Sequence, residues 1–347
     1  MNYKEKLKKF FYHKTGFEHS HFAGRTNTHI WLLAEYLSKK YNRPTIIVPT
    51  TSCVSPILIF KFFKIKMIFV DIDIDTGLLK GKEILKIIRT QHVNAIFYIN
   101  LYGNLSDNLF LKTAQERKIL IIQDLAQTFI RSSKIKNKKY IFGDILLLSF
   151  GYSKIFDLGE GGVMLTNNID IFNQITKNYE IFKEVKNDKI NYKKKYLNWY
   201  KNVFVNFRRI KIDEISVFIK ALYLKKIKKF LYKKMYIQIQ GLEFEERRRL
   251  NLLKNYKNYF KNKKIKIIHS KNVFIPWRFS FTVNKKNKIL NKLRSNNYDA
   301  SSYYLSFKKV SKCNSYNLEK KIVNLWLTDN IKLEDIKNQY NLIKDLV

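Results

Sequence analysis

The chain has 347 residues, 46% of them hydrophobic, so it is long enough to bury a large core and predicts one large domain with a smaller companion. It has no secretory signal at its start and no run of about eighteen apolar residues, and a cytoplasmic protein is expected. Its two cysteines, Cys53 and Cys313, lie far apart and support neither a disulfide framework nor a zinc site, so no metal is expected.

The formal net charge of +39 is of the kind found in proteins that bind nucleic acid or anionic membranes. Lysine is nevertheless scattered along the whole chain together with Asn and Ile, which indicates a compositional bias rather than one binding patch. The densest basic region, residues 183–235, also contains many aromatic residues. Binding to a membrane or to nucleic acid there stays open, but solvated lysine faces are the favoured interpretation.

Residues 45–166 alternate short β-rich apolar runs with amphipathic stretches, which is typical of a largely parallel sheet covered by helices. The expected strands are 45–49, 67–71, 95–100, 119–123, 145–149 and 163–166. The expected helices are 28–39, 54–63, 81–89 and 106–117, and Ser106 is a suitable cap for the last of them.

Long helical stretches follow from about residue 169 to 265. A strand-forming segment at 273–283, a helix at 288–296 and a closing helix at 331–346 complete the chain. We therefore predict an α/β protein with a three-layer large domain, built on a mostly parallel sheet, and a smaller α+β domain at the C-terminus. The expected limits are 1–200 for the large domain, 201–268 for a helical connection and 269–347 for the small domain.

One lysine, Lys154, lies between the expected strand 145–149 and a glycine-rich turn at Gly161 and Gly162. One carboxylate, Asp124, follows the expected strand 119–123. Ligands of α/β sheets bind at the carboxyl ends of the strands. A lysine that forms a Schiff base with an aldehyde, and an aspartate that pairs with a pyridine nitrogen, are the groups that pyridoxal phosphate chemistry needs from a protein.

Two runs carry a family resemblance. The first is Asp124-Leu125-Ala126-Gln127. The second is Ser149-Phe150, followed after three residues by Lys154 and, six residues after Lys154, by Glu160-Gly161-Gly162. Together they resemble the DegT/DnrJ/EryC1/StrS family of pyridoxal-phosphate-dependent sugar aminotransferases, whose fold is the aspartate aminotransferase type, fold type I. The resemblance makes Lys154 and Asp124 the catalytic residues. It places Gln127 over the cofactor and directs the hydroxyl of Ser149 to the cofactor phosphate.

The segment Gly24-Arg25-Thr26-Asn27-Thr28 is similar to the phosphate loop of the same family. It implies that Thr26, Asn27 and Arg25 bind the phosphate at the start of a helix. Every one of these residues also has an ordinary structural interpretation, such as a surface lysine, a turn aspartate or a capped helix start. The sequence leaves both interpretations open.

The chain also departs from the family pattern. Cys53 stands where the family places an aromatic ring against the cofactor, and Asn100 stands where it has a histidine. The run Asn206-Phe207-Arg208 is a doubtful match to a segment that reaches the partner subunit. Sugar contacts are expected near Trp277, Arg278 and the pair Tyr303-Tyr304.

The resemblance implies transfer of an amino group, from glutamate, to a keto group of a nucleotide-activated sugar, for aminosugar or surface polysaccharide synthesis by a homodimer. Two alternatives stay open. Some family members are pyridoxal-phosphate-dependent sugar dehydratases, in which a histidine typically replaces the lysine, and Lys154 argues against that branch. The other alternative is a non-catalytic relative of the family that binds membrane or nucleic acid through its basic helices.

Overall fold

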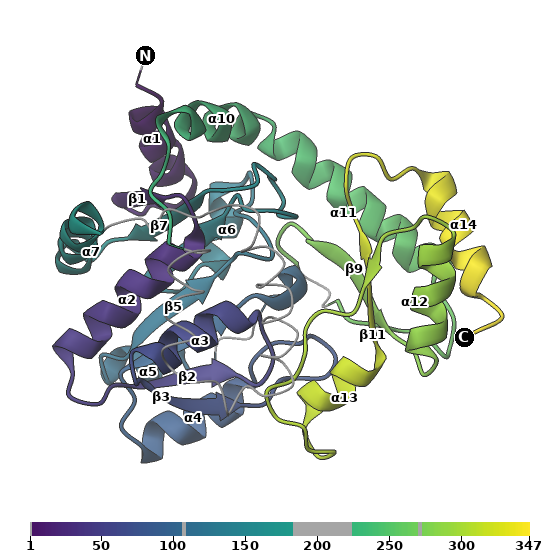
Figure 1. Cartoon of the computed structure of the whole chain (residues 1–347), viewed down its shortest axis with the longest axis horizontal. Coiled ribbons are helices and arrows are strands. Elements are labelled where there is room, and N and C mark those ends of the chain that lie inside the picture. The colour runs from purple at the N-terminus through teal and green to yellow at the C-terminus, as the bar shows by residue number, and fades with distance from the viewer. Residues whose placement is uncertain (1, 106–108, 183–223, 270–272) are drawn as a thin grey trace, which may run out of the picture.

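The computed structural model of this chain describes residues 2–105, 109–182, 224–269 and 273–347. Figure 1 shows two sheets, a large one in the first half of the chain and a smaller one near the C-terminus. The α/β class predicted from the sequence is confirmed, as is the mostly parallel character of the large sheet.

The large sheet has seven strands in the order β1-β7-β6-β5-β4-β2-β3. They are β1 (His19–Ala23), β2 (Thr45–Pro49), β3 (Lys66–Val70), β4 (Ala95–Ile99), β5 (Leu120–Asp124), β6 (Ile145–Ser149) and β7 (Gly162–Thr166). Strands β2 to β6 pair in parallel, whereas β7 is antiparallel to β6 and β1 is antiparallel to β7. Six of these strands were expected within one residue at each end. Strand β1 was missed because His19-Ser20-His21 is too polar to stand out as an apolar run.

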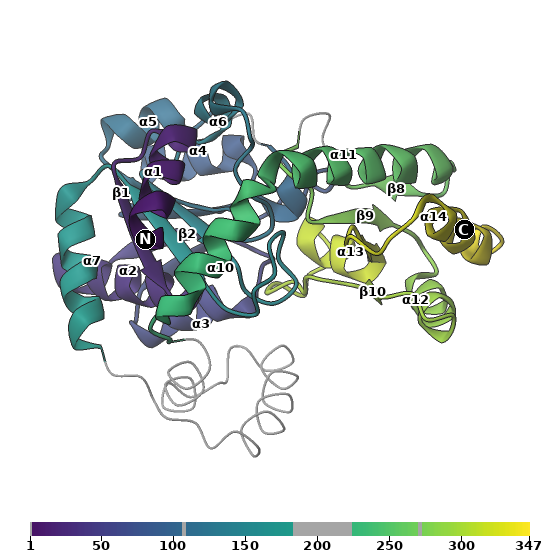
Figure 2. The same ribbon diagram turned by 90° about the horizontal axis from the view of Figure 1, so that it is seen from above.

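Helices cover both faces of the large sheet, so the predicted three layers are present. In Figure 2, α4, α5 and α6 lie on one side of the sheet and α2 and α3 on the other. The helices of this part are α1 (Tyr3–Thr15), α2 (Thr26–Lys40), α3 (Val54–Phe62), α4 (Gly81–Thr90), α5 (Leu111–Glu116), α6 (Lys134–Tyr140) and α7 (Ile169–Ile181), with a 3-10 turn at Leu101–Gly103.

The predicted helix 106–117 is too long at its start, because α5 begins only at Leu111. The ring of Phe110 is buried and stacks on Tyr98 of β4, with ring centroids 5.7 Å apart, and this contact holds the preceding turn against the sheet. The proposed cap Ser106 lies outside the described residues, as does the run Asn206-Phe207-Arg208.

The smaller sheet is antiparallel, in the order β10-β11-β9-β8. Its strands are β8 (Lys266–Ile267), β9 (Arg278–Thr282), β10 (Ala300–Ser301) and β11 (Ile322–Trp326), and its helices are α12 (Lys286–Ser295), α13 (Asn314–Lys321) and α14 (Leu333–Ile343). Phe279 and Phe281 alternate along β9 and pack on Phe260, so they begin a second hydrophobic core. The two expected helices of this region are present, whereas the expected strand-forming segment 273–283 forms a strand only from Arg278 to Thr282.

Two successive helices, α10 (Lys229–Gln240) and α11 (Leu242–Tyr259), lead from the large sheet to the small one. Figures 1 and 2 show α11 running along the small sheet, away from α10. The buried Glu246 of α11 accepts a 2.6 Å hydrogen bond from Nε of Arg131, which ties this helix to the large domain. The predicted boundary at residues 200 and 201 lies outside the described residues, and the domain limits stay a prediction.

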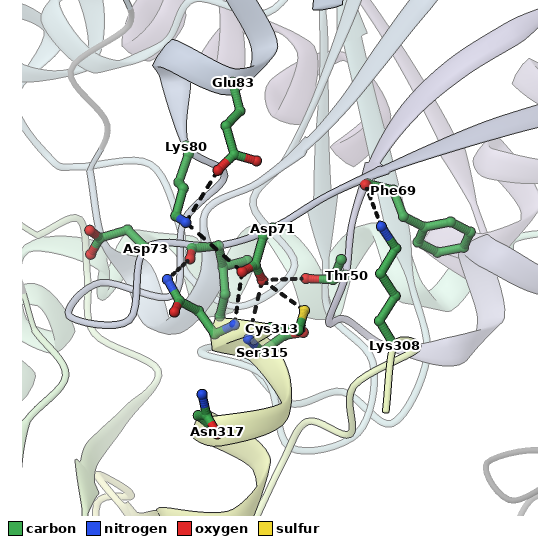
Figure 3. A network of polar contacts seen from close by, with 12 residues as sticks. Thr50, Phe69, Asp71, Asp73, Lys80, Glu83, Lys308, Cys313, Ser315 and Asn317 are labelled. Carbon is green, nitrogen blue, oxygen red and sulfur yellow. Dashed lines mark hydrogen bonds and ion pairs between the residues drawn. The ribbon is translucent and has the colours of Figure 1, made fainter. Parts of the chain in front are cut away.

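A polar network also joins the two sheets at the end of β3 (Figure 3). The carboxylate of Asp71 accepts hydrogen bonds from the backbone N–H of Asn314 at 2.8 Å, from that of Ser315 at 3.2 Å and from Thr50 Oγ1 at 3.1 Å. It also accepts one from Cys313 Sγ at 3.1 Å. Asp71 therefore caps α13 from another domain, since the first amides of a helix have no partner within it.

Within the described residues, no group of His, Cys, Asp and Glu side chains is arranged to hold a metal ion. Among the helices of the described ranges, none combines the length and the apolar character that a membrane crossing requires.

Candidate active site

The predicted catalytic carboxylate and lysine reach one region from neighbouring strands. Asp124 is the last residue of β5 and pairs with Leu147 of β6, and Ser149 ends β6 five residues before Lys154. Parallel strands place their carboxyl ends at the same edge of a sheet, and that edge is where α/β proteins bind ligands. The sheet thus collects Asp124, Ser149 and Lys154.

The segment that carries Lys154 is held by hydrogen bonds from both domains. Asp157 Oδ2 accepts from the backbone N–H of Ser153 at 2.6 Å, and the N–H of Lys154 donates to the carbonyl of Gly151 at 3.3 Å. From the small domain, Nε1 of Trp277 donates to the carbonyl of Ser153 at 2.6 Å. Lys154 Nζ lies 5.5 Å from the centre of the Trp277 ring. The amine is therefore positioned at the contact between the two domains.

Burial perturbs both members of the predicted catalytic pair. It raises the pKa of Asp124, which is 6% exposed, to about 6, although the N–H of Ala126 and the charge of Lys154 act in the opposite direction. Burial lowers the pKa of the Lys154 amine, Arg278 lowers it further, and Asp124 raises it. Each group thus offsets part of the effect of burial on the pKa of the other.

The predicted phosphate loop is the start of α2. Arg25 precedes the helix without a side-chain cap, and Thr26 and Asn27 are its first two residues, where backbone amides have no acceptor within the helix. Thr26 is fixed in place because its hydroxyl donates to the carbonyl of Leu148 at 2.8 Å. A Cβ atom added to Gly162 would lie 2.4 Å from the nitrogen of Thr26, so only glycine allows this approach of β7 to the helix start.

Arg25, Ser149 and Gly151 converge beside this helix start. A Cβ atom added to Gly151 would lie 3.4 Å from both Arg25 Nη1 and Ser149 Oγ. The Nε of Arg25 is buried, and nothing in the described part of the chain accepts its hydrogen bond. An uncapped helix start, a hydroxyl and a guanidinium with a free donor match a phosphate group. The residues present therefore fit the phosphate of pyridoxal phosphate, which Arg25, Ser149 and the start of α2 would hold.

Two further residues named from the sequence, Gln127 and Asn100, form side-chain hydrogen bonds within the protein. Gln127 Oε1 accepts from the backbone N–H of Tyr102 at 3.1 Å. The side chain of Asn100 accepts from Gln123 Nε2 and donates to the carbonyl of Asn104, both at 2.9 Å. Gln127 is thereby held at the predicted site, whereas Asn100 stabilises the turn that follows β4.

Cys53 precedes α3, and its thiol lies 3.5 Å from Ser55 Oγ. Cys53 interacts electrostatically with both Lys154 and Tyr304, so it lies near the lysine. The position that the family fills with an aromatic ring is thus occupied by a small thiol beside the lysine.

Lys154 also lines an open cavity of about 620 Å³ between the two domains. Trp277 and Trp326 line it from the small domain, and Asp157 and Tyr152 from the large one. Trp277 was singled out from the sequence as a sugar contact. Trp326 was missed, because a tryptophan at the end of a short strand carries no local signal. Its place at the site arises from the pairing of β11 with β9.

The sequence model of the DegT/DnrJ/EryC1/StrS aminotransferase family matches residues 3–338. The chain belongs to this family. The resemblance carried by the two motifs is thereby confirmed for nearly the whole chain, including segments without a recognisable motif. Membership of a sugar aminotransferase family implies dependence on pyridoxal phosphate.

A curated relative, the GDP-perosamine synthase of Escherichia coli O157:H7, is 32% identical over 154 residues. That match covers 44% of this chain and 40% of the relative, so the chain is aligned to less than half of the relative's length.

Solved structures support the fold over the full length. Helicobacter pylori PseC, an aminotransferase involved in the biosynthesis of pseudoaminic acid, has a TM-score of 0.76 at 13% identity, and the match covers 99% of this chain and 91% of PseC. E. coli GDP-4-keto-6-deoxy-D-mannose-3-dehydratase with bound hydrated PLP has a TM-score of 0.74 at 16% identity, and the match covers 99% of this chain and 92% of the dehydratase. The fold is therefore shared by aminotransferases and a dehydratase, and it does not separate the two activities.

Proposed function

We propose that this protein uses pyridoxal phosphate to transfer an amino group from glutamate to a keto group of a nucleotide-activated sugar. The observation that carries the proposal is that Asp124 and the segment of Lys154 follow the carboxyl ends of the adjacent strands β5 and β6, where each charge offsets the effect of burial on the other. The similarity to a GDP-perosamine synthase supports an aminosugar product, of the kind used in surface polysaccharides. We infer a cytoplasmic homodimer from the family.

When bound, pyridoxal phosphate supplies an aldehyde that takes up amines and a ring that accepts the electron pair released at the donor carbon. Asp124 would hold a positive charge on the pyridine nitrogen, because its carboxyl, with a pKa of about 6, is ionised at neutral pH. Arg25, Ser149 and the start of α2 at Thr26 and Asn27 would bind the phosphate.

Lys154 would move the proton. Burial lowers the pKa of its amine, so more of the neutral form is present at physiological pH than for an exposed lysine. A neutral Nζ can take a proton from one carbon and return it to another. This lysine also favours an aminotransferase over a dehydratase, because dehydratases of the family typically have a histidine at this position.

The test begins with cofactor binding. Wild-type protein incubated with pyridoxal phosphate and then desalted is expected to keep a visible absorbance band. Lys154→Ala is expected to lose it, and Lys112→Ala, which removes an exposed lysine of α5, is expected to keep it. Glutamate should bleach the band, and nucleotide keto sugars, including GDP-4-keto-6-deoxy-D-mannose, should restore it with an aminosugar detected by mass. A protein that stays colourless would overturn the proposal.

A further inference from the structure

Three neighbouring helices of the large domain, α1, α6 and α10, form a strongly basic surface. Helix α1 packs against both of the others, and Figures 1 and 2 show it beside α10. The ring of Tyr3 in α1 lies 5.8 Å from that of Tyr236 in α10. Asn137 of α6 donates a 3.0 Å hydrogen bond to the carbonyl of Lys14 in α1. The exposed lysines of these helices, which we call the basic face, are Lys4, Lys9, Lys134, Lys136, Lys138, Lys139, Lys229, Lys233 and Lys234.

The charge balance of these helices differs from that of the whole chain, so a general bias toward lysine does not explain it. The whole sequence has 67 Lys and Arg residues and 28 Asp and Glu residues. The three helices contain twelve lysines and one acidic residue, Glu5. By contrast, α7 and α14 each have two acidic residues and one lysine. The basic residues are thus concentrated on one side of the large domain.

The lysines of these helices are largely without acidic partners. Lys8 forms an ion pair with Glu5, at 2.9 Å. No other lysine of the three helices forms an ion pair with a residue that the structure describes. The basic face therefore presents its positive charge to whatever lies outside the protein.

Apolar side chains are exposed among these lysines. Tyr12 of α1 is 48% exposed and Ile135 of α6 is 82% exposed, while Phe230 and Ile237 of α10 are 50% and 56% exposed. Phe230 and Ile237 are seven residues apart and lie on the same side of the helix. Lys234 Nζ lies 5.1 Å from the centre of the Phe230 ring, so charged and apolar groups are intermixed. This mixture is typical of helices that lie in the interface of a membrane.

The charge of the basic face selects an anionic partner and argues against a second copy of this chain. A two-fold contact would place the same lysines of two copies against each other, and like charges repel. Ile135 and Ile237 are aliphatic and offer no ring on which a nucleic-acid base can stack. Such side chains fit the boundary between the headgroups and the acyl chains of a lipid layer.

We propose that the basic face binds the surface of a membrane that contains anionic phospholipids. The lysines would contact lipid phosphates, and the exposed apolar side chains would enter the layer below the headgroups. The attachment would be peripheral, and salt would weaken it because the charges are exposed. The inference is independent of the proposed function, since α1, α6 and α10 contribute neither Asp124 nor Lys154.

The experiment measures co-sedimentation with two kinds of vesicle, one of phosphatidylcholine alone and one of phosphatidylcholine mixed with phosphatidylglycerol. Wild-type protein is expected to bind the mixed vesicles at physiological salt and to bind the phosphatidylcholine vesicles much less. It should leave the mixed vesicles at a salt concentration of about 1 M, where surface charges are screened.

A triple lysine variant tests the charge of the basic face. It is expected to weaken binding to the mixed vesicles at least about tenfold, because each lysine near an anionic surface adds to the affinity. The three changes, all in α6, are Lys134→Gln, Lys138→Gln and Lys139→Gln. The control removes the same charge at three exposed positions of the small domain, at the start of α12 and within it: Lys285→Gln, Lys288→Gln and Lys292→Gln.

A second variant tests the apolar side chains. Ile135→Gln combined with Ile237→Gln keeps every lysine and is expected to weaken binding to the mixed vesicles at least about fivefold, because less apolar area enters the lipid. Leu333→Gln is the control, since Leu333 is 53% exposed on α14. All of the replaced side chains are exposed, so each variant should have the thermal unfolding midpoint of the wild type.

No binding of the wild type to the mixed vesicles at physiological salt would overturn the inference, as would equal binding by the triple lysine variant and its α12 control. Binding to a single-stranded oligonucleotide that is tighter than to the vesicles, and unchanged in the isoleucine variant, would assign the basic face to nucleic acid instead. A smaller oligomer of the triple lysine variant in analytical ultracentrifugation would assign it to a subunit contact. These results do not depend on whether the protein binds pyridoxal phosphate.

Discussion

Asp124 and Lys154 reduce the effect of burial on one another. Burial raises the pKa of the Asp124 carboxyl to about 6 and lowers that of the Lys154 amine, while each charge acts in the opposite direction on its neighbour. Neither group is an ordinary surface residue, although both could have been taken for one in a chain so rich in lysine. Such perturbed pairs are typical of functional sites.

The raised pKa of Asp124 predicts a pH dependence of stability in the cofactor-free protein. The folded form holds a proton between the ordinary pKa of 3.8 and about 6, whereas the unfolded chain has released it. The free energy of unfolding that Asp124 contributes is therefore lost as pH rises through this window, by about 3 kcal/mol.

Asp124→Asn should lack this loss. The unfolding free energy of the wild type minus that of the variant should therefore fall from pH 4 to pH 7. Urea unfolding at several pH values measures it. Asp170→Asn, an exposed residue of α7, serves as the control. Wild-type and Asp124→Asn curves that run parallel through the window would contradict the prediction.

Gly162→Ala is expected to disturb the phosphate loop. Its Cβ would lie 2.4 Å from the nitrogen of Thr26, so the start of α2 must shift. We expect a loss of stability of about 1–3 kcal/mol, the range for overpacking, together with weaker binding of pyridoxal phosphate. Thermal unfolding and cofactor titration measure the two effects.

The matched control is Gly241→Ala, where the nearest atom to an added Cβ is the Gln238 carbonyl oxygen at an ordinary 3.5 Å. That variant should leave both properties nearly unchanged. Equal cofactor affinity in the two variants would show that the spacing between β7 and α2 is unimportant.

Asp71→Asn is expected to weaken the contact between the two sheets shown in Figure 3. Burial alone would raise the pKa of Asp71, but hydrogen bonds from Asn314, Cys313 and Ser315 lower it overall. The stabilisation is thus present above the ordinary pKa of 3.8 and is lost as pH falls through the lowered value. We expect the variant to lose about 1–3 kcal/mol at neutral pH, because an amide cannot accept all of these donors.

Proteolysis near α13 at neutral pH should be faster in Asp71→Asn than in the wild type. Asp75→Asn is the control, since its side chain is 60% exposed in a surface ion pair with Lys266. If the two variants are cleaved at the same rate, the cap on α13 does not hold the sheets together.

Cys53→Phe is expected to strengthen cofactor binding. The thiol lies beside Lys154, where the family places a ring, and an aromatic contact adds about 0.5–1.5 kcal/mol, or roughly twofold to twelvefold in affinity. Titration of the cofactor-free protein with pyridoxal phosphate gives the two dissociation constants. Cys53→Ser, which adds no ring, should bind as the wild type does. Weaker binding by Cys53→Phe would mean that the small thiol is required for space.

Most strands of the large sheet were predictable because each is a short, buried apolar run. The run Ile145–Ser149 is buried at each position, and such a run needs no tertiary information to be recognised. Strand β1 carries polar residues, and only its pairing with β7 makes it a strand. The extent of α5 likewise depends on Phe110 packing against β4, which lies outside any local window.

The sequence alone determined the family and predicted the chemistry, because Asp124, Ser149, Lys154 and the glycines after it stand at short spacings fixed by one strand and one turn. Tertiary structure alone decided how distant residues meet beside Lys154. Trp277 and Arg278 could be named from the sequence, but only the pairing of β9 with β11 brings Trp326 beside them, more than a hundred residues from Lys154. Such contacts depend on how the two sheets pack against each other. The free energy that stabilises this packing comes from many residues along the chain, so no single sequence motif predicts it.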